Sequence, residues 1–176
     1  VARPAHERLG VERDRQPGQR EGACADVLER RAAPLGRAAT PVGSVEQWAR
    51  TQTPAGAVFA VPPSWSGFRS HARRAVVVDF KAFPFQPEQI PVWFERLADL
   101  APISLPERAD PRLQATLDDA FLRRAPEALA RAASRYGIDY VVRHRSAPLA
   151  HPAFELTHDA GPWLVYRYRA HEPELA

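Results

Sequence analysis

The feature that most constrains the fold is an uninterrupted apolar run at residues 57–61, Ala-Val-Phe-Ala-Val, which ends at Pro62-Pro63. A strand with one face in water alternates apolar and polar residues, whereas a strand covered on both faces is apolar throughout. Proline lacks the N–H group that a sheet ladder needs, so the strand should end there. The run therefore predicts a buried strand in the middle of an α/β sheet.

Four more segments have strand character. The apolar runs 75–78 and 138–142 predict strands that neighbour the first one. Farther along, the segments 154–157 and 163–168 flank the turn-like residues 158–162, His-Asp-Ala-Gly-Pro. Side chains in the last segment alternate between two faces, which predicts an antiparallel hairpin at a sheet edge.

The segments between the strands show helical spacing and helix-start signals. Ser44-Val-Glu-Gln47 fits a capping box, and Thr53-Pro54 should end that helix because proline disfavours a helical residue before it. Apolar residues then recur every three or four positions. The remaining expected helices run from Pro87 to Leu100, from Asp110-Pro111 onward, and from Pro126 to a C-terminal cap at Gly137.

Together these elements predict an α/β domain at residues 41–176: a small, mostly parallel sheet with helices on one or both faces and a C-terminal antiparallel β-hairpin. Residues 1–40 hold eight arginines and no aromatic residue. We expect that segment to be disordered or loosely packed, and a non-native sequence would have the same character. The chain contains no methionine, so we expect it to be a piece of a longer product or a product with an unusual or processed start.

Composition limits the classes of function. The 24 basic and 21 acidic residues leave a net charge of +3, too balanced to favour nucleic-acid binding. The single cysteine, Cys24, excludes an intrachain disulfide, and no stretch approaches the roughly 20 apolar residues that span a bilayer. His144, His151 and His158 lack an acidic or cysteine residue to complete a metal set. We expect no metal and no cofactor, since no phosphate-binding glycine motif is present.

Ligands of open α/β sheets bind beyond the carboxyl ends of the parallel strands. If the strands that end at Val61, Asp79 and Val142 are parallel, their outgoing turns meet at one edge of the sheet. Arginine makes forked contacts to phosphate and carboxylate groups, so basic residues in these turns predict an anion site. The residues expected there are Arg69, Arg73, Arg74, Lys81 and Arg143, with Asp79 to orient them.

A structural interpretation of the same cluster stays open. Loops are usually charged because they are solvated, and Asp79 can pair with Lys81 or Arg69 with little effect on stability. No catalytic residue is predicted. Ser64 and Ser66 follow a strand but lack the first glycine of a nucleophile elbow, and the Asp118-Asp119 pair fits a solvated helix face.

One block of residues, in its order, resembles a known kind of domain. The matching residues are Trp48, Thr53-Pro54, Ala57 to Pro63, Gly67-Phe-Arg69, Arg74 to Phe85, Trp93 to Arg96 and Tyr136 to Val142. Across about residues 44–168 the chain resembles an uncharacterised soluble domain at the C-terminus of bacterial multi-spanning membrane proteins. Those proteins resemble glycosyltransferases that use lipid-linked sugars. The membrane helices of such proteins are missing here, and residues 1–40 occupy their place.

The resemblance implies a non-catalytic accessory domain on the extracytoplasmic side of the cell membrane. Its partners would be the membrane domain of the same parent protein and, in addition, a lipid phosphate or another anion. The residues alone leave a second hypothesis, a free-standing α/β protein that binds a phosphorylated or carboxylate ligand at the Arg69/Asp79/Lys81 edge.

Overall fold

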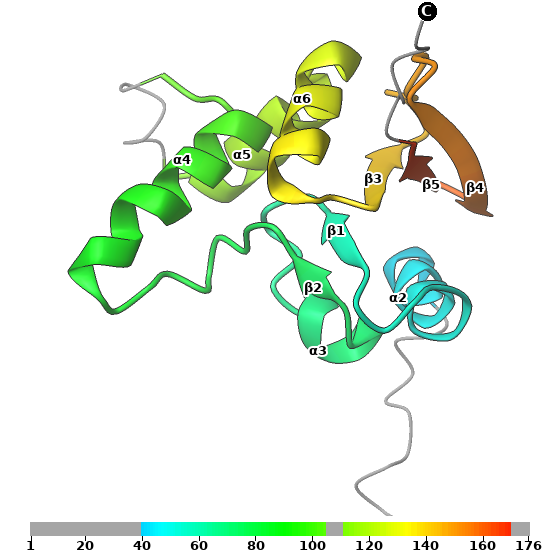
Figure 1. Ribbon diagram of the computed structural model, residues 1–176, viewed down its shortest axis with the longest axis horizontal. Helices are drawn as coiled ribbons and strands as arrows, with labels where there is room; N and C mark the ends of the chain where they lie inside the picture. The colour runs from blue at the N-terminus through cyan, green and yellow to red at the C-terminus, as the bar shows by residue number, and fades with distance from the viewer. Residues whose placement is uncertain (1–39, 105–110, 170–176) are drawn as a thin grey trace, which may run out of the picture. The chain divides into compact units, whose positions relative to one another are not determined.

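The computed structural model describes residues 40–104 and 111–169, so the expectations for residues 1–39 and for Asp110 lie outside the described residues. Figure 1 shows the elements along the chain. They are α2 (Pro41–Gln52), β1 (Val58–Ala60), α3 (Phe68–Ala72), β2 (Ala75–Val76), the 3₁₀ turn Pro87–Gln89, α4 (Ile90–Leu100), α5 (Leu113–Arg123), α6 (Pro126–Tyr136), β3 (Tyr140–His144), β4 (Phe154–Ala160) and β5 (Trp163–Tyr168).

Within the described residues, five strands form one mixed sheet in the order β2-β1-β3-β5-β4. Strand β1 is parallel to both β2 and β3, as the apolar runs predicted. Strand β5, however, is antiparallel to β3 and to β4. The prediction of a mostly parallel sheet is therefore wrong. Without a helix between β3 and the hairpin, the chain makes no crossover, so β5 returns beside β3 in the opposite direction.

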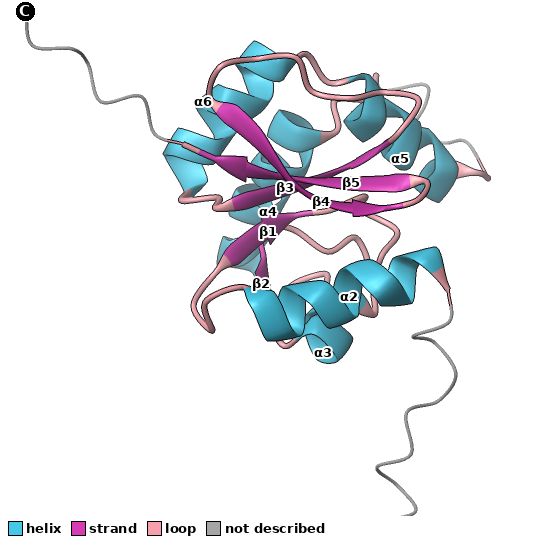
Figure 2. Ribbon diagram, turned by 90° about the vertical axis from the view of Figure 1, so that its right-hand side faces the viewer, coloured by secondary structure: helices cyan, strands magenta, loops and turns pink. Residues whose placement is uncertain are grey.

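Helices cover both faces of this sheet, as Figure 2 shows. Helices α2 and α3 pack on one face, where Phe59, Val61 and Phe68 belong to one buried cluster. Helices α4, α5 and α6 pack on the other face, in a cluster that includes Ala60 and Leu97. Successive residues of β1 thus enter opposite cores, which explains why this segment of the sequence is apolar without alternation.

Helix α2 starts one turn earlier than the capping box predicted. Thr40 is its N-cap, with Oγ1 accepting a hydrogen bond from Gly43 N at 3.0 Å, and Pro41 occupies the first helical position. Ser44 lies inside the helix and donates its backbone N–H to the Thr40 carbonyl at 2.9 Å. The sequence contains two helix-start signals, Thr40-Pro41 and the capping box at Ser44. The helix begins at the earlier signal, which adds one turn. The predicted end at Thr53 is confirmed.

The other helices follow the predicted spacing with shifted ends. Helix α6 begins at Pro126 and is capped by Gly137, whose φ of 63° is the left-handed conformation expected there. Helix α4 is preceded by a 3₁₀ turn at Pro87–Gln89. Helix α5 begins only at Leu113, with Pro111 and Arg112 in a turn. Apolar periodicity located these helices, whereas their first residues depend on local turns that periodicity does not report.

The predicted C-terminal hairpin is confirmed, and β4 forms one edge of the sheet. Its turn is tighter than expected, because β4 continues to Ala160 and Gly161 turns the chain with φ 73°. The pairing register shifts between Leu156 and His158, which leaves Thr157 without an opposite residue on β5. This irregularity is a β-bulge in the edge strand.

A membrane-spanning helix would have to be long and apolar, and none of the helices in residues 40–104 and 111–169 meets that requirement.

Candidate functional site

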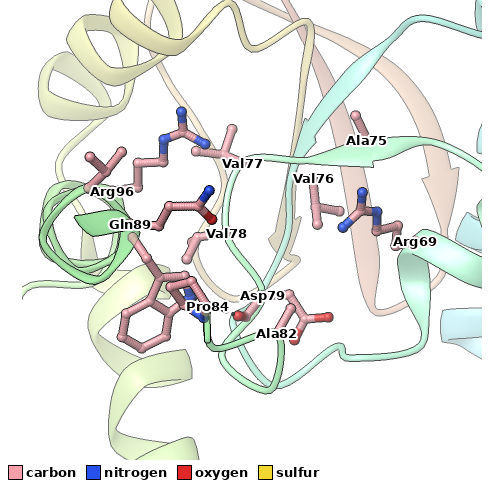
Figure 3. A pocket seen from close by; sticks show the side chains of 12 residues that line it. Arg69, Ala75, Val76, Val77, Val78, Asp79, Ala82, Pro84, Gln89 and Arg96 are labelled. Atoms are coloured by element: carbon pink, nitrogen blue, oxygen red, sulfur yellow. Dashed lines mark hydrogen bonds between the residues drawn. The ribbon is translucent and has the colours of Figure 1, made fainter. Parts of the chain in front are cut away.

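A groove of about 430 Å³ lies beside β2, the second edge strand of the sheet, and we call it the β2–α4 groove. The consecutive residues 75–79, which form β2 and the bend after it, line one side. Gln89, Val92, Trp93 and Arg96 line it from α4 and the turn before α4. Arg69 of α3 and the loop residues Ala82 and Pro84 complete the lining (Figure 3). The groove therefore combines an open strand, an apolar helix face and two arginines.

The two arginines approach the groove from opposite faces of the sheet. Arg69 belongs to α3, which packs with Phe59 on one face, while Arg96 belongs to α4, which packs on the other. Figure 3 shows their side chains on either side of the strand segment. Both side chains are exposed. Arg96 also lies over the ring of Tyr136 of α6, 5.8 Å from its centroid.

Asp79 is the acidic residue of the groove lining, and its hydrogen bonds are structural. Its carboxylate accepts the backbone N–H of Lys81 at 2.9 Å, which fixes the turn after β2. Its carbonyl oxygen accepts the indole N–H of Trp93 at 3.1 Å, which ties α4 to that turn. The charged residues of the lining are Arg69, Arg96 and Asp79, so the groove has a net charge of +1.

Strand β2 has a short free edge beside the groove. The N–H of Val77, directly after the strand, donates to the Phe59 carbonyl at 3.0 Å. Because alternate residues of a strand direct their N–H and C=O groups to opposite sides, those of Val76 point away from β1. The chain bends at Val77, and Val77 and Val78 both belong to the core cluster on the α4 side. The strand edge along the groove is therefore only two residues long.

The structure brings only Arg69 and Asp79 of the predicted rim together in this groove. Lys81 follows the same turn and is exposed, outside the groove lining. Arg73 is also exposed, as the left-handed C-cap of α3 with φ 52°. Since Arg73 and Arg74 immediately precede β2, they lie at its amino end rather than at the carboxyl end that we expected.

Arg74 and Arg143 are buried and bind backbone carbonyls instead of facing solvent. The Arg74 guanidinium donates to the carbonyls of Arg50 at 2.8 Å and Thr53 at 2.6 Å, at the end of α2. Arg143 donates to Phe121 O at 2.8 Å and to Leu122 O, at the end of α5. Burial lowers the pKa of Arg143 to about 10, with a smaller opposing effect from Tyr166. These two arginines cap helices.

Aromatic residues close the sheet edge above β1 and β3, where the outgoing turns were expected to meet. Trp65 and His144 both contact Trp163 edge-on, with ring centroids 4.6 and 5.1 Å away. Beside them, the Asp118 carboxylate accepts the backbone N–H of Ser64 at 3.0 Å. Burial raises the pKa of Asp118, opposed by its hydrogen bonds from Ser64. Asp118 therefore anchors the loop after β1 and is not simply a solvated helix residue.

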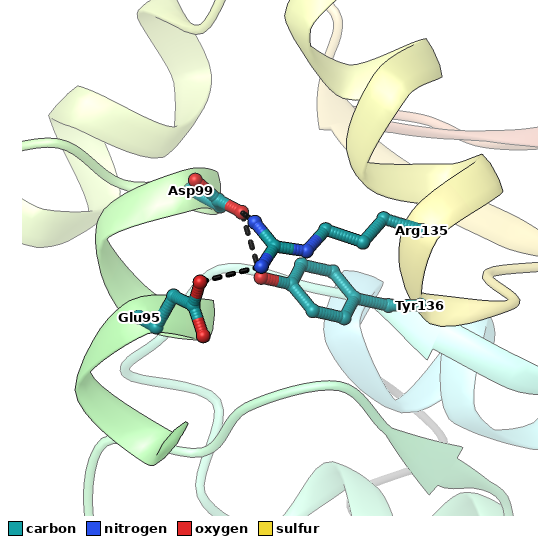
Figure 4. Close-up of polar contacts among 4 residues, drawn as sticks. All are labelled: Glu95, Asp99, Arg135 and Tyr136. Atoms are coloured by element: carbon teal, nitrogen blue, oxygen red, sulfur yellow. Dashed lines mark hydrogen bonds and ion pairs between the residues drawn. The ribbon is translucent and has the colours of Figure 1, made fainter. Parts of the chain in front are cut away.

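A polar cluster between α4 and α6 fixes the groove wall (Figure 4). Arg135 of α6 forms ion pairs with Glu95 and, at 3.1 Å, with Asp99 of α4. The Tyr136 hydroxyl donates to the same Asp99 carboxylate at 2.6 Å. Burial and this hydrogen bond raise the pKa of Tyr136 to about 12. The cluster holds α4 in one orientation against α6, and Arg96 projects from α4 into the groove.

Sequence reasoning missed the contribution of α4. Trp93 was assigned to an apolar stripe and Arg96 to no site, although they lie three residues apart and so on one side of the helix. The three-residue spacing indicates that Trp93 and Arg96 share one side of the helix. It does not indicate that this side faces the edge of the sheet.

Comparison with known proteins gives one partial match. Residues 41–100, from α2 through β1, α3 and β2 to α4, match the model of a domain of unknown function (DUF6798). The matched segment contains every residue that lines the β2–α4 groove. The chain matches none of the curated proteins, and nothing links it to glycosyltransferase-like membrane proteins. The segment from Pro41 to Leu100 is thus similar to a domain family whose function is unknown.

Proposed function

We propose that this chain is a binding domain and that the β2–α4 groove takes an organic anion with an apolar part. One observation carries the proposal: Arg69 and Arg96 reach a single groove from two separate helical layers. Two guanidinium groups at one groove favour a carboxylate or phosphate, which arginine binds with paired hydrogen bonds. Val76, Val92 and Trp93 supply an apolar surface beside them.

The size and shape of the groove agree with this class of ligand. Its volume of about 430 Å³ falls within the range usual for small-ligand sites. Trp93 is held in place by its hydrogen bond to the Asp79 carbonyl, and Phe80 and Phe83 pack around it with ring centroids 6.2 and 5.2 Å away. An apolar wall that is already fixed loses little entropy when a ligand binds.

Binding of octyl phosphate and octanoate to the full chain tests the proposal, because each probe joins an anionic head to an apolar tail. Amide chemical shifts of residues 75–79 should move on titration. Arg69→Ala and Arg96→Ala should each weaken binding about 10-fold, as expected for loss of a charge-assisted hydrogen bond. Arg131→Ala, an exposed arginine on α6 outside the groove, is the matched control and should bind like the unmodified chain. Equal affinity in all three variants would refute the proposal.

A second candidate function is an accessory domain at a membrane surface, within a multi-spanning parent protein. It is supported by Phe83 and Phe85, which are 47% and 100% exposed and follow Lys81 in one loop. Exposed aromatic residues beside a cation suit the headgroup region of an anionic bilayer.

Sedimentation with phosphatidylglycerol vesicles tests this candidate membrane-surface function. Binding should be lost in a Phe83→Ser/Phe85→Ser variant, and unchanged binding would exclude the loop as an anchor. Apolar segments of about 20 residues encoded in the same reading frame would identify the parent as a membrane protein.

A further inference from the structure

We infer that a second cavity, between α4 and α6, binds inorganic phosphate in a protonated form. We call it the α4–α6 cavity. Its volume is about 250 Å³, and it shares no lining residue with the β2–α4 groove, so the inference is independent of the proposed function. A cavity of this size is smaller than most sites for drug-sized ligands and suits a compact ion. The lining consists of Asp99 of α4, Arg124 from the turn between α5 and α6, and Ala128, Arg131, Ala132 and Arg135 of α6.

One side of α6 supplies most of this lining. Its four lining residues are spaced three or four positions apart, so they lie along the same side of the helix. Ala128 and Ala132 are buried and have no side-chain atoms beyond Cβ, whereas Arg131 and Arg135 are exposed. The alanines therefore leave space against the helix, and the arginines place guanidinium groups beside that space.

The cavity has more positive charge than the surrounding residues neutralise. Three arginines and one aspartate line it, which gives the lining a net charge of +2. Arg135 already forms ion pairs with Glu95 and Asp99. Arg124 and Arg131 form no ion pair with any residue that the structure describes. Two unpaired guanidinium groups at one small cavity favour an anion that accepts several hydrogen bonds, as phosphate does.

The guanidinium of Arg124 is the group that most needs a partner. Its Nε atom is buried and has no hydrogen-bond partner among the described residues. The two helix-capping arginines differ, because Nε of Arg74 donates to Thr53 Oγ1 and Nε of Arg143 donates to the Ala147 carbonyl, each at 3.0 Å. A guanidinium that has lost water without gaining an acceptor is costly. An anion at Arg124 would compensate this charge, which is delocalised over the whole group.

Asp99 determines which anion fits the cavity. Its Oδ2 atom accepts hydrogen bonds from Arg135 at 3.1 Å and from the Tyr136 hydroxyl at 2.6 Å. Its Oδ1 atom, directed away from both in Figure 4, accepts none from the part of the chain that the structure describes. A carboxylate in the lining repels sulfate, which carries two charges and no proton, but it can accept the O–H of hydrogen phosphate. The lining therefore favours phosphate over sulfate.

An NMR titration of the full chain with sodium phosphate at constant ionic strength tests the inference. At about pH 7.5 inorganic phosphate keeps an O–H group, whereas sulfate and methyl phosphate have none. We expect saturable shifts at the amides of residues 128–132 and at the Arg124 Nε–H. Sulfate and methyl phosphate should bind about 10-fold more weakly. Octyl phosphate also lacks the O–H group and should not compete here, so Arg131→Ala remains a valid control for the β2–α4 groove.

Two variants should lose the phosphate. Arg124→Met keeps an unbranched side chain and removes the unpartnered guanidinium, and Arg131→Ala removes the second cation; each should weaken binding about 10-fold. Arg123→Ala is the matched control, because Arg123 is exposed, lies outside the lining and pairs with Asp119 at 3.9 Å. It should bind phosphate like the unmodified chain. If Arg124→Met fails to fold, Arg131→Ala still decides the outcome, since Arg131 is exposed.

The outcomes separate this inference from the proposed function. Equal phosphate affinity in the Arg123, Arg124 and Arg131 variants would indicate general ionic attraction and overturn the inference. Equal affinity of the unmodified chain for phosphate and sulfate would overturn the assignment to phosphate. Phosphate shifts confined to residues 75–79 would also overturn it, while the β2–α4 groove would remain an anion site. Failure of octyl phosphate and octanoate to bind would refute the proposed function and leave the α4–α6 cavity unaffected.

Discussion

His158 lies flat against Trp48, with ring centroids 4.8 Å apart and ring planes at 4°. The contact joins the edge strand β4 to α2 across one face of the sheet. The Nε2 atom of His158 is buried and has no hydrogen-bond partner among the described residues. An imidazole in this position is more stable when neutral, because a charged ring would have to give up water without a compensating acceptor.

The first prediction concerns acid stability. Burial lowers the pKa of His158, with a smaller opposing effect from Asp159. Protonation is therefore disfavoured in the folded chain relative to the unfolded chain, so the stabilising effect is complete above the usual histidine pKa of about 6.5 and is lost as the pH falls. His158→Phe keeps an aromatic ring against Trp48 and should reduce the loss of unfolding free energy between pH 7 and pH 5. The same loss in both proteins would contradict the prediction.

The second prediction concerns Arg143, which we expected in a ligand site and which instead caps α5. Arg143→Ala leaves the buried carbonyls of Phe121 and Leu122 without their donor. The free energy of unfolding should fall by about 2 to 3 kcal/mol, measured by urea denaturation. Arg167→Ala removes an exposed arginine from β5 and should change the free energy of unfolding by less than about 0.5 kcal/mol. If Arg143→Ala leaves the free energy of unfolding unchanged, these hydrogen bonds do not stabilise the fold.

The third prediction separates backbone strain from steric fit. Gly137 has φ 63°, yet a Cβ atom added there would meet nothing within 4 Å. Gly137→Ala should therefore lower the free energy of unfolding by about 1 to 2 kcal/mol through conformation alone. Gly56→Ala is the control, since its added Cβ is equally free of contacts and its φ lies outside the left-handed region. Equal effects of the two substitutions would argue against the left-handed cap.

The fourth prediction concerns alkaline pH. The pKa of Tyr136 is raised to about 12, whereas tyrosine in an unfolded chain titrates near 10. Between these values the unfolded chain loses the proton first, so this contribution to stability is complete below pH 10 and declines as the pH rises toward 12. Tyrosinate absorbance should show one late transition that Tyr136→Phe removes. If Tyr136→Phe leaves the absorbance curve above pH 10 unchanged in shape, the assignment to Tyr136 is wrong.

The parts of the fold that could be predicted are those that depend on local pattern. The apolar run at 57–61 indicated a strand covered on both faces, and Gly137 indicated the end of α6; both are confirmed. The antiparallel direction of β5 depends on which strands become neighbours in the sheet. The order of apolar and polar residues in the sequence does not determine those neighbours. Arg143 was misassigned for a related reason. The carbonyls that it binds belong to α5, about 20 residues away in the chain, and only packing brings them together.

The candidate site was predictable only in part, because its walls come from different elements, α3 and α4, whose packing on the sheet is not visible in the sequence pattern. Arg69 and Asp79 were expected near the ends of strands, where ligands of α/β sheets commonly bind. Arg96 faces them because the Arg135–Glu95–Asp99 cluster orients α4 against α6. Whether these side chains bind an anion stays a prediction that the titrations above will test.

The bulge at Thr157 also determines how large an assembly this sheet can enter. A strand laid against β4 would have to follow the displaced register, and β2, at the other edge, is only two residues long. Neither edge therefore offers a long, regular template for a further strand. Stacking of copies of the chain into fibres, edge to edge, is disfavoured at both sides of the sheet.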